Sequence, residues 1–255
     1  MNAHSPRLLP EPRPLPGFRD VALFLDLDGT LAAIEPRPED VGPEPWRTAL
    51  LHRLEEKLNG RLAVISGRSL GEVDRILDGA VEAVAAVHGL VRRSADGALE
   101  QAAPAEGLGF ARAQLNELAA GHPGLAVEDK VLSLAIHFRQ APELADEIRR
   151  QAQAIAADAG LRLQLGDMVA ELCTPGLDKG AAVRAFMNEP PFQDSLPVFV
   201  GDDLTDEDGF RAAQAFGGVS VLVGPLRPTA ADMRLEDVES VRGWLEASLM
   251  HDSQP

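Results

Sequence analysis

The sequence has no tyrosine, a single cysteine and few aromatic residues of any kind (4%). Its core must therefore be built from Leu, Val, Ile and Ala, which suits an apolar content of 45% in 255 residues. One cysteine excludes an internal disulfide, and Cys173 lies in the apolar run "MVAELCT", where we expect a buried thiol rather than a nucleophile. No apolar run reaches the length of a membrane span.

Positive charge is also scarce, because 24 Lys and Arg oppose 40 Asp and Glu, a formal net charge of −16. Such a chain repels nucleic acid and anionic membranes, so we expect neither as a partner. A phosphate site here needs local cations, a metal or backbone N–H groups. The N-terminal "MNAHSPRLLPEPRPLPGF" lacks the apolar region of a signal peptide. Its prolines predict an extended or loosely attached arm. We expect a cytoplasmic monomer that acts on a small molecule.

Short apolar runs alternate with helical stretches over most of the chain. Continuous apolar runs are typical of strands buried on both faces, as in a parallel sheet. The alternation predicts an α/β fold with a Rossmann-like, doubly wound parallel sheet. The expected strands are 21–26, 61–67, 81–89, 196–202 and 218–224, and the expected helices are 43–60 (with Gly60 as its C-cap), 69–79, 178–189 and 205–217.

The middle of the chain has a different pattern. It predicts, in order, a helix at 105–121, two strands within 125–139, a helix at 141–160, and a hairpin over 161–174 that turns at Gly166–Asp167. This α-β-β-α-β-β order suits a small open-faced sheet with helices on one side. We therefore expect an inserted α+β cap domain at 104–174, between core segments at 18–103 and 175–250.

Polar residues follow three of the expected parallel strands. Asp26 and "LDGT" end the first, Ser66 ends the second, and Asp202 with Asp203 follows the fourth, while Lys179 begins the helix before that strand. In open α/β sheets, ligands bind beyond the carboxyl ends of the strands. These groups should therefore surround one point.

This set of groups suits phosphoryl transfer to an aspartate. Asp26 would attack phosphorus and form an aspartyl-phosphate that water later hydrolyses. Carboxylates from two strand ends can hold Mg²⁺, which offsets charge on the phosphoryl oxygens. Asp28 could protonate the leaving oxygen and later deprotonate the attacking water. Ser66 and Lys179 would hydrogen-bond and neutralise the transferring group.

The motifs "DLDGT", "ISGR", "DKG" and "GDDLTDE" resemble those of the haloacid dehalogenase (HAD) superfamily of aspartate-nucleophile phosphatases. The segments "VHG", "VEDKVLSLAIHFRQAP" and "VAELCTPGLDKGAAV" are further similar to the trehalose-6-phosphate phosphatase family. The resemblance runs from about residue 20 to residue 230. It implies Mg²⁺-dependent hydrolysis of trehalose 6-phosphate to trehalose and phosphate.

The resemblance also implies roles for individual residues. Asp26 is the nucleophile and a metal ligand, and Asp28 is the acid/base that gives its backbone carbonyl to the metal. Asp202 is the third protein ligand, Asp203 supports the waters of the metal, and Asp206 supports the ligands. The inserted segment is similar to the family's cap, which closes over the sugar. The expected substrate-binding residues are Gly67, Arg68, His88, Gly89, Glu128, Lys130 and Glu171.

From the residues alone, the cap positions stay open. Glu128 and Lys130 share one strand face, and an exposed ion pair explains them as well as a sugar site does. Glu171 lies inside an apolar run and needs a partner, which a sugar hydroxyl would supply. His137 fits a structural role or a ligand contact equally, and Arg139 is no more certain. His88 with Gly89 fits either a turn or a site contact.

The sequence departs from the family pattern after "HG". The family often has a Glu soon after this pair, and "HGLVRRS" has none, which leaves a sugar contact from that loop in doubt. No synthase segment precedes the motifs, so we expect action on a freely diffusing substrate.

Other activities also fit the core motifs. The alternatives to a trehalose-6-phosphate phosphatase are a phosphatase for sucrose phosphate or mannosyl-phosphoglycerate, a phosphomutase, and a non-catalytic sugar-phosphate sensor.

The stretch "GDDLTDED" holds five carboxylates in seven residues. We expect Thr205 to begin a helix, with Asp208 completing a capping box. Asp206, Glu207 and Asp208 would then lie in the first turn, where the helix dipole favours negative charge.

Overall fold

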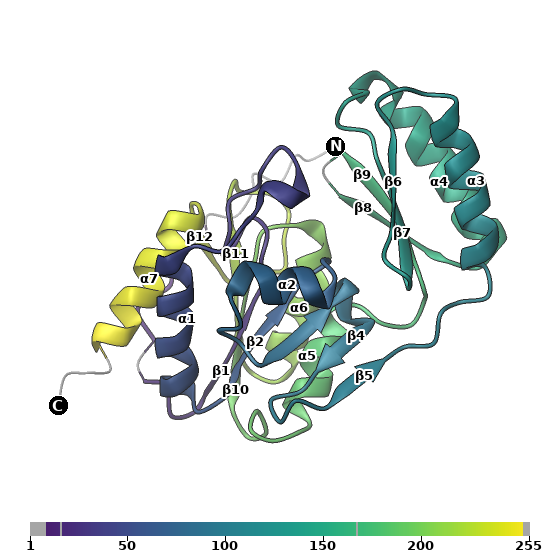
Figure 1. Ribbon diagram of the computed structural model, residues 1–255. Helices are drawn as coiled ribbons and strands as arrows, with labels where there is room; N and C mark the ends of the chain where they lie inside the picture. The colour runs from purple at the N-terminus through teal and green to yellow at the C-terminus, as the bar shows by residue number, and fades with distance from the viewer. Residues whose placement is uncertain (1–8, 16, 167, 252–255) are drawn as a thin grey trace, which may run out of the picture. The chain divides into compact units, whose positions relative to one another are not determined.

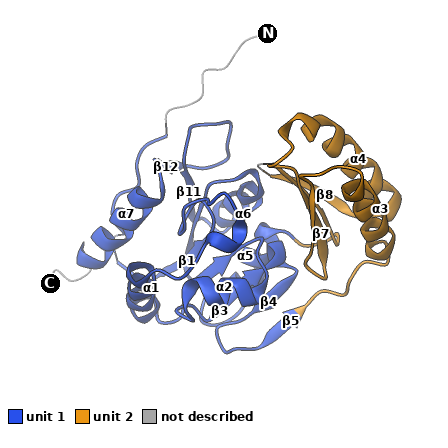
Figure 2. Ribbon diagram, turned by 45° about the horizontal axis from the view of Figure 1, so that its top comes forward, with its two compact units in different colours: residues 1–100, 178–255 blue, residues 101–177 orange. Residues whose placement is uncertain are grey.

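The computed structural model describes residues 9–15, 17–166 and 168–251, which form two compact units. Unit 1 is formed by the described residues of 1–100 and 178–255, and unit 2 by those of 101–177 (Figure 2). The range 104–174 expected for the inserted domain falls within unit 2. None of the helices in these described ranges is long and apolar enough to cross a membrane.

Unit 1 is built on a sheet that has eight strands in the described residues, in the order β12-β11-β10-β1-β2-β3-β4-β5 (Figure 1). The pairs from β12 to β3 are parallel, and β4 is antiparallel to β3. The strands are β1 (Val21–Leu25), β2 (Leu62–Ile65), β3 (Ala83–Ala86), β4 (Val91–Arg93), β5 (Leu99–Gln101), β10 (Leu196–Gly201), β11 (Val219–Val223) and β12 (Met233–Leu235).

The five strands expected for the parallel sheet are present. Every residue of β1, β2 and β3 is buried, because helices cover parallel strands on both faces. Strands β4, β5 and β12 were not predicted. Each has three residues, and "VRR" and "LEQ" contain no apolar run.

Helices lie on both faces of this sheet. Phe186 and Phe210 pack with Phe24 and Phe199 on one face, in a cluster to which α5 and α6 contribute. Helix α1 contacts β1, β2 and α7 and contributes nothing to that cluster, so it covers the other face. The helices are α1 (Pro45–Leu58), α2 (Leu70–Leu77), α5 (Lys179–Met187), α6 (Glu207–Ala215) and α7 (Val238–His251), with 3-10 turns η1 (Pro38–Asp40), η2 (Val87–Gly89) and η4 (Leu204–Asp206).

Two helix ends position residues near the strand ends. Ser69 begins α2 with a capping box, in which its hydroxyl accepts from the Glu72 N–H. The Asp178 carboxylate caps α5 by accepting from the Ala181 N–H at 2.7 Å. At the end of α1, Asn59 is the left-handed C-cap rather than Gly60, which follows it with φ 79°.

Unit 2 is an antiparallel sheet in the order β6-β7-β9-β8, with α3 and α4 packed on one face through an apolar cluster. The predicted α-β-β-α-β-β order is confirmed. The elements are α3 (Leu108–Ala120), β6 (Ala126–Asp129), β7 (Ser133–His137), η3 (Pro142–Leu144), α4 (Ala145–Ala159), β8 (Arg162–Gly166) and β9 (Val169–Cys173). Of the turn predicted at Gly166–Asp167, Asp167 lies outside the described residues. Cys173 is fully buried, as expected, and burial raises its pKa to about 12.

The N-terminal arm was expected to be extended or loosely attached, and the described residues 9–15 contradict the second alternative. The Pro10 carbonyl accepts from the N–H of Arg234 on β12 at 3.0 Å, and the Arg13 carbonyl accepts from Nε1 of Trp244 on α7 at 2.8 Å. The Leu15 N–H donates to Oγ of Ser248 at 3.0 Å, and Leu15 is buried. The prolines keep this segment without regular structure, but backbone hydrogen bonds fix it along β12 and α7.

Candidate active site

The carboxyl ends of β1 and β10 lie side by side, because Leu25 pairs with Val200 in parallel register. The Asp26 N–H donates to the Val200 carbonyl at 2.9 Å, so Asp26 continues the pairing by one residue. Asp202 follows the last residue of β10. Oxygens of Asp26, Asp202 and Asp206 all lie within 4.8 Å of one another. The strand register therefore gathers three carboxylates at this edge of the sheet.

Lys179, the first residue of α5, is the cation of this cluster. Its Nζ lies 2.8 Å from Oδ1 of Asp26 and 2.6 Å from Oδ1 of Asp206. Asp206 is fully buried, and its Oδ2 accepts from the N–H groups of Asp202 and Asp203 at 3.0 and 2.9 Å. Asp206 thus connects the ammonium of one element to the backbone of the acidic loop.

Negative charge remains in excess at this point. Burial raises the pKa of Asp26 well above its ordinary value, and Asp206 raises it further, although Lys179 opposes both effects. Burial and Asp206 likewise raise the pKa of Asp202 to about 7. Burial by itself would lower the pKa of Lys179, but Asp206 and Asp26 outweigh it and raise that pKa.

The cluster fits a divalent cation that prefers oxygen ligands. Oδ1 of Asp202 is buried and has no hydrogen-bond partner among the described residues, so one carboxylate oxygen is left to coordinate an ion. A side chain at Gly29, where φ is 79°, would collide with the Asp202 carboxylate. Carboxylate oxygens with one uncompensated acceptor are a donor set that suits Mg²⁺.

The ends of β2 and β3 adjoin each other in the same unit. Ser66 follows β2 and is buried, and its Oγ accepts from the Arg68 N–H at 3.2 Å. The His88 N–H donates to the Ser66 carbonyl at 2.9 Å. A Cβ at Gly67 would collide with the His88 ring, which is therefore packed against the motif backbone. Gly89, with φ 97°, closely approaches the carbonyl of Asp178, the residue before Lys179.

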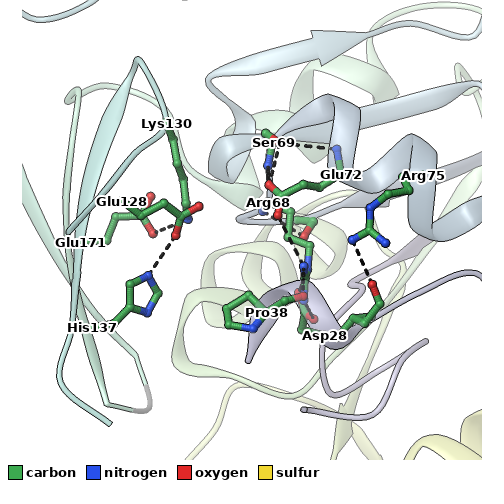
Figure 3. Close-up of polar contacts among 12 residues, drawn as sticks. Asp28, Pro38, Arg68, Ser69, Glu72, Arg75, Glu128, Lys130, His137 and Glu171 are labelled. Carbon is green, nitrogen blue, oxygen red and sulfur yellow. Dashed lines mark hydrogen bonds and ion pairs between the residues drawn. The ribbon is translucent and has the colours of Figure 1, made fainter. Parts of the chain in front are cut away.

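Arg68 turns toward the loop after β1 rather than toward Ser66. Its Nε lies 2.7 Å from Oδ2 of Asp28, and its Nη2 lies 2.7 Å from Oδ1 of the same carboxylate (Figure 3). Both oxygens of Asp28 are therefore engaged by one guanidinium, in the forked geometry that arginine favours with carboxylates.

Unit 2 has its own cluster of charges, on the face of the sheet opposite its helices. Glu128, Ala135 and Glu171 are aligned across three strands, whereas their neighbours Ile136 and Ala170 belong to the apolar cluster under α3 and α4. Nε2 of His137 lies 2.9 Å from Oε2 of Glu128 (Figure 3).

Glu171 has two partners on the same face. Nζ of Lys130 lies 3.3 Å from its Oε2, and Oγ of Ser133 lies 2.5 Å from its Oε1. Burial would lower the pKa of Lys130, but Glu171 and Glu128 outweigh it and raise that pKa. The hydrogen bond from His137, and to a smaller extent Lys130, lowers the pKa of Glu128 against the effect of burial.

Comparison with known proteins identifies the family. The family model described as trehalose-phosphatase matches residues 24–239. The trehalose-6-phosphate phosphatase of Escherichia coli (strain K12) is 40% identical over 227 residues, covering 88% of this chain and 85% of that protein. This chain belongs to the trehalose-phosphatase family. A probable trehalose-phosphate phosphatase of Sinorhizobium fredii is 35% identical, covering 89% of this chain and 86% of that one.

Solved structures agree with the family at the level of the fold. A trehalose-6-phosphate phosphatase related protein matches with a TM-score of 0.75 and 26% identity, over 90% of this chain and 97% of the other. The C-terminal domain of the Candida albicans trehalose-6-phosphate phosphatase matches with a TM-score of 0.85 and 19% identity, over 97% and 99%. A phosphatase of the HAD superfamily from Bacteroides thetaiotaomicron matches with a TM-score of 0.61 and 18% identity, over 89% of this chain and 92% of the other, so the mixed α/β core has the fold of HAD phosphatases.

Several residues expected at the trehalose-phosphatase site lie together in the core. Asp26, Lys179, Asp202 and Asp206 form the cluster described above. Asp203 does not join the three carboxylates, since its Oδ1 accepts from the Leu204 N–H at 2.6 Å. In the cap, Glu128, Lys130 and Glu171 share a face, but Glu171 is already satisfied by the chain, and Arg139 is exposed.

The capping box predicted for Thr205 and Asp208 is wrong. Asp203 is the N-cap of η4 and Asp206 its third residue, and each side chain accepts from the backbone of the other. Helix α6 then begins at Glu207 without a side-chain cap. The box forms earlier because Asp206 is drawn inward by Lys179, which turns its second oxygen toward the Asp202 and Asp203 N–H groups.

Arg227 was missed by the sequence reasoning. Its Nη2 donates to the carbonyls of Asp202 and Asp203 at 3.2 and 2.7 Å, and its Nη1 pairs with Glu207. Burial by itself would raise the pKa of Glu207. Its hydrogen bonds to Ala230, Thr229 and Arg227 together outweigh burial, so the pKa is lowered. Arg227 follows β11, so the strand-end rule that found Asp26 could also have found it.

Proposed function

We propose that this chain hydrolyses trehalose 6-phosphate to trehalose and inorganic phosphate, with Asp26 as the nucleophile. The observation that supports this most directly is the buried Asp26 carboxylate at the end of β1. It lies 2.8 Å from the Lys179 ammonium, beside the uncompensated Asp202 oxygen. Membership of the trehalose-phosphatase family supports the substrate.

The reaction has two displacements at phosphorus. A carboxylate oxygen of Asp26 attacks, the bond between phosphorus and the sugar oxygen breaks, and Asp28 gives a proton to that leaving oxygen. Water then attacks the aspartyl-phosphate, Asp28 takes the proton of the water, and the bond to Asp26 breaks. Asp28 gives one proton in the first step and takes one in the second, so the enzyme neither gains nor loses a proton over the cycle.

Two further residues act on the phosphoryl group. Lys179 holds Asp26 in place and brings positive charge to a buried site, where charge interactions are stronger than in water. Ser66 offers its hydroxyl from the end of β2. Burial, and then the charge of Asp206, raise the pKa of Asp26, and positive charge bound at the site would favour its ionised, nucleophilic form.

We assign the metal to Asp26 and Asp202, with the backbone carbonyl of Asp28 as the third ligand that the family resemblance implies. Mg²⁺ bound there would neutralise charge on the phosphoryl oxygens and orient them toward the nucleophile. Asp206 supports the metal ligands without binding the metal, because one of its oxygens pairs with Lys179 and the other accepts from the Asp202 and Asp203 N–H groups.

Sugar recognition belongs, in this proposal, to the polar face of unit 2. Glu128, Lys130 and Glu171 offer two carboxylates and an ammonium, which suit sugar hydroxyls as donors and acceptors. Their present partners are on the same face, so hydroxyls would replace or extend existing hydrogen bonds rather than fill empty positions.

A panel of phosphate esters tests this function. Released phosphate is measured for trehalose 6-phosphate, sucrose 6-phosphate, mannosyl-phosphoglycerate and glucose 6-phosphate, with Mg²⁺ and with EDTA. We expect phosphate to be released fastest from trehalose 6-phosphate. EDTA should abolish the release of phosphate. Equal rates on the other sugar phosphates would reject the substrate, and full activity in EDTA would reject the metal. A bisphosphorylated intermediate among the products would indicate a mutase instead.

A further inference from the structure

The pair between Arg68 and Asp28 gives Arg68 a different role from the substrate contact that its motif predicts. The guanidinium meets both Asp28 oxygens at 2.7 Å, and the two side chains are 9% and 36% exposed. Asp28 is the residue to which the proposed function assigns both proton transfers. The inference below therefore rests on that proposed function.

Arg68 is itself held by fixed groups. Its Nη1 donates to the Pro38 carbonyl at 2.8 Å, and Glu72 lies 3.6 Å away on the first turn of α2 (Figure 3). Its backbone is fixed as well, since its N–H donates to Ser66 and its carbonyl accepts from the Val87 N–H at 2.9 Å. A side chain anchored at both ends in this way can impose an orientation on a more exposed partner.

We propose that Arg68 is a positioning residue that orients the Asp28 carboxylate for proton transfer. A general acid is effective only when its protonated oxygen lies within hydrogen-bond reach of the leaving atom. The fork of Arg68 fixes the plane of the carboxylate, and it can keep one N–H···O bond while the other oxygen turns to the substrate. Lysine cannot replace it, because an ammonium lacks the fork.

This role has a signature that a phosphate contact lacks. A positioned acid matters most when the leaving group is a strong base, and little when the leaving group departs unprotonated. Phenyl phosphate and p-nitrophenyl phosphate have nearly the same shape, but phenolate is a much stronger base than p-nitrophenolate. Their kcat/KM values report only the steps up to loss of the leaving group, so the later role of Asp28 does not enter.

The experiment measures kcat/KM for both aryl esters, with Mg²⁺, in the wild type, Arg68→Gln, Arg68→Lys and Asp28→Asn. We expect Arg68→Gln to lose roughly 10–100-fold on phenyl phosphate, part of the 10²–10⁴-fold that general acids contribute, and several-fold less on p-nitrophenyl phosphate. Arg68→Lys should show the same selectivity. Arg75→Gln is the matched control, because Arg75 lies on α2 and donates to the Val41 carbonyl at 3.0 Å. It should leave both rates near wild type.

Two further measurements distinguish this inference from its rivals. Inhibition by inorganic phosphate should be nearly unchanged in Arg68→Gln, and adding Arg68→Gln to Asp28→Asn should cost little more than Asp28→Asn alone. Equal losses on both esters with weaker phosphate inhibition would make Arg68 a phosphate contact and overturn the inference, even if Asp28→Asn is selective. If Asp28→Asn shows no leaving-group selectivity, the acid role of Asp28 fails too. Neither result depends on whether trehalose 6-phosphate is the substrate. Thermal melting identifies a variant that fails to fold, and Arg68→Lys then carries the test.

Discussion

The carboxylates of the two units differ in how completely they are hydrogen-bonded and paired with positive charge. In unit 1, Asp26, Asp202 and Asp206 crowd within 4.8 Å around Lys179, and one Asp202 oxygen has no partner among the described residues. In unit 2, Glu128 and Glu171 each have a partner from a neighbouring strand, and Glu171 has two. The core cluster has a buried carboxylate oxygen without a partner among the described residues, whereas both carboxylates of unit 2 are hydrogen-bonded within that unit.

This difference separates two kinds of function. Excess negative charge at buried strand ends is relieved by a bound cation or by protonation, so changes in the core should alter metal binding and the chemical step. Carboxylates that are already hydrogen-bonded can exchange these partners for sugar hydroxyls without a change of charge. Changes in the cap should therefore alter substrate affinity and leave the chemistry of simple esters intact.

The largest effect is expected from Asp26→Asn. It removes the nucleophile but keeps the shape of the side chain, so turnover should fall by roughly 10⁴-fold or more, with an unchanged circular dichroism spectrum. Released phosphate from trehalose 6-phosphate and p-nitrophenyl phosphate measures it. Activity that survives on either ester would remove Asp26 as the nucleophile and erase the distinction between the two units.

The pH dependence of stability without metal is the next test of the core. The pKa of Asp202 is about 7 in the fold and 3.8 in its reference state. Between these values the folded protein binds more protons than the unfolded chain, so this group makes stability fall as pH rises from about 4 to 7. We expect the Tm in EDTA to drop by several degrees over that range in excess of the drop in Asp202→Asn. Mg²⁺ at pH 7.5 should restore it, and no restoration at millimolar Mg²⁺ would contradict the metal site.

In the cap, Glu171→Gln should raise the KM for trehalose 6-phosphate by roughly tenfold, because a buried carboxylate partner of Lys130 and Ser133 is lost. The kcat/KM for p-nitrophenyl phosphate, which has no sugar, should stay within about twofold. Glu143→Gln, at an exposed position of the same unit, is the control. An equal loss on both esters would show that the cap cluster supports the fold rather than the substrate.

Sequence patterns predicted the core well because burial leaves a strong signal. "VALFL" and "PVFV" are apolar at every position, so both faces must be covered, and the parallel register then brings Asp26 and Asp202 together. Strands β4, β5 and β12 left no such signal, because each has three residues and, of these, only Leu235 of β12 is buried.

Side-chain pairing was much harder to predict. The pairs Arg68–Asp28 and Arg227 with the Asp202 and Asp203 carbonyls join residues 24 to 40 positions apart. The capping box was predicted at the wrong residues. Asp206 forms the box with Asp203 because it also pairs with the buried ammonium of Lys179, which the local sequence does not indicate. Such choices depend on which elements are brought together, and propensity within a short window contains no information about that.

Arg227→Gln should weaken Mg²⁺ binding by about tenfold, as loss of an outer contact often does. Arg227 donates to the carbonyls of Asp202 and Asp203, so its removal should loosen the loop that aims the Asp202 carboxylate. Calorimetric titration of the protein with Mg²⁺ measures this without turnover. Arg53→Gln is the control, since Arg53 is exposed on α1. Unchanged affinity would confine Arg227 to its pair with Glu207.

The smallest effect is expected at His137, whose Nε2–H donates to Oε2 of Glu128 at 2.9 Å on a partly exposed face. His137→Phe keeps a ring and loses this bond, so the KM for trehalose 6-phosphate should rise by about threefold, in line with roughly 0.5–1.5 kcal/mol for one hydrogen bond. His137→Gln keeps an N–H donor of similar reach and should restore most of the affinity. If both variants weaken binding equally while p-nitrophenyl phosphate is unaffected, the imidazole itself contacts the sugar. If both lower the Tm without changing KM, the pair with Glu128 is a structural feature of the cap alone.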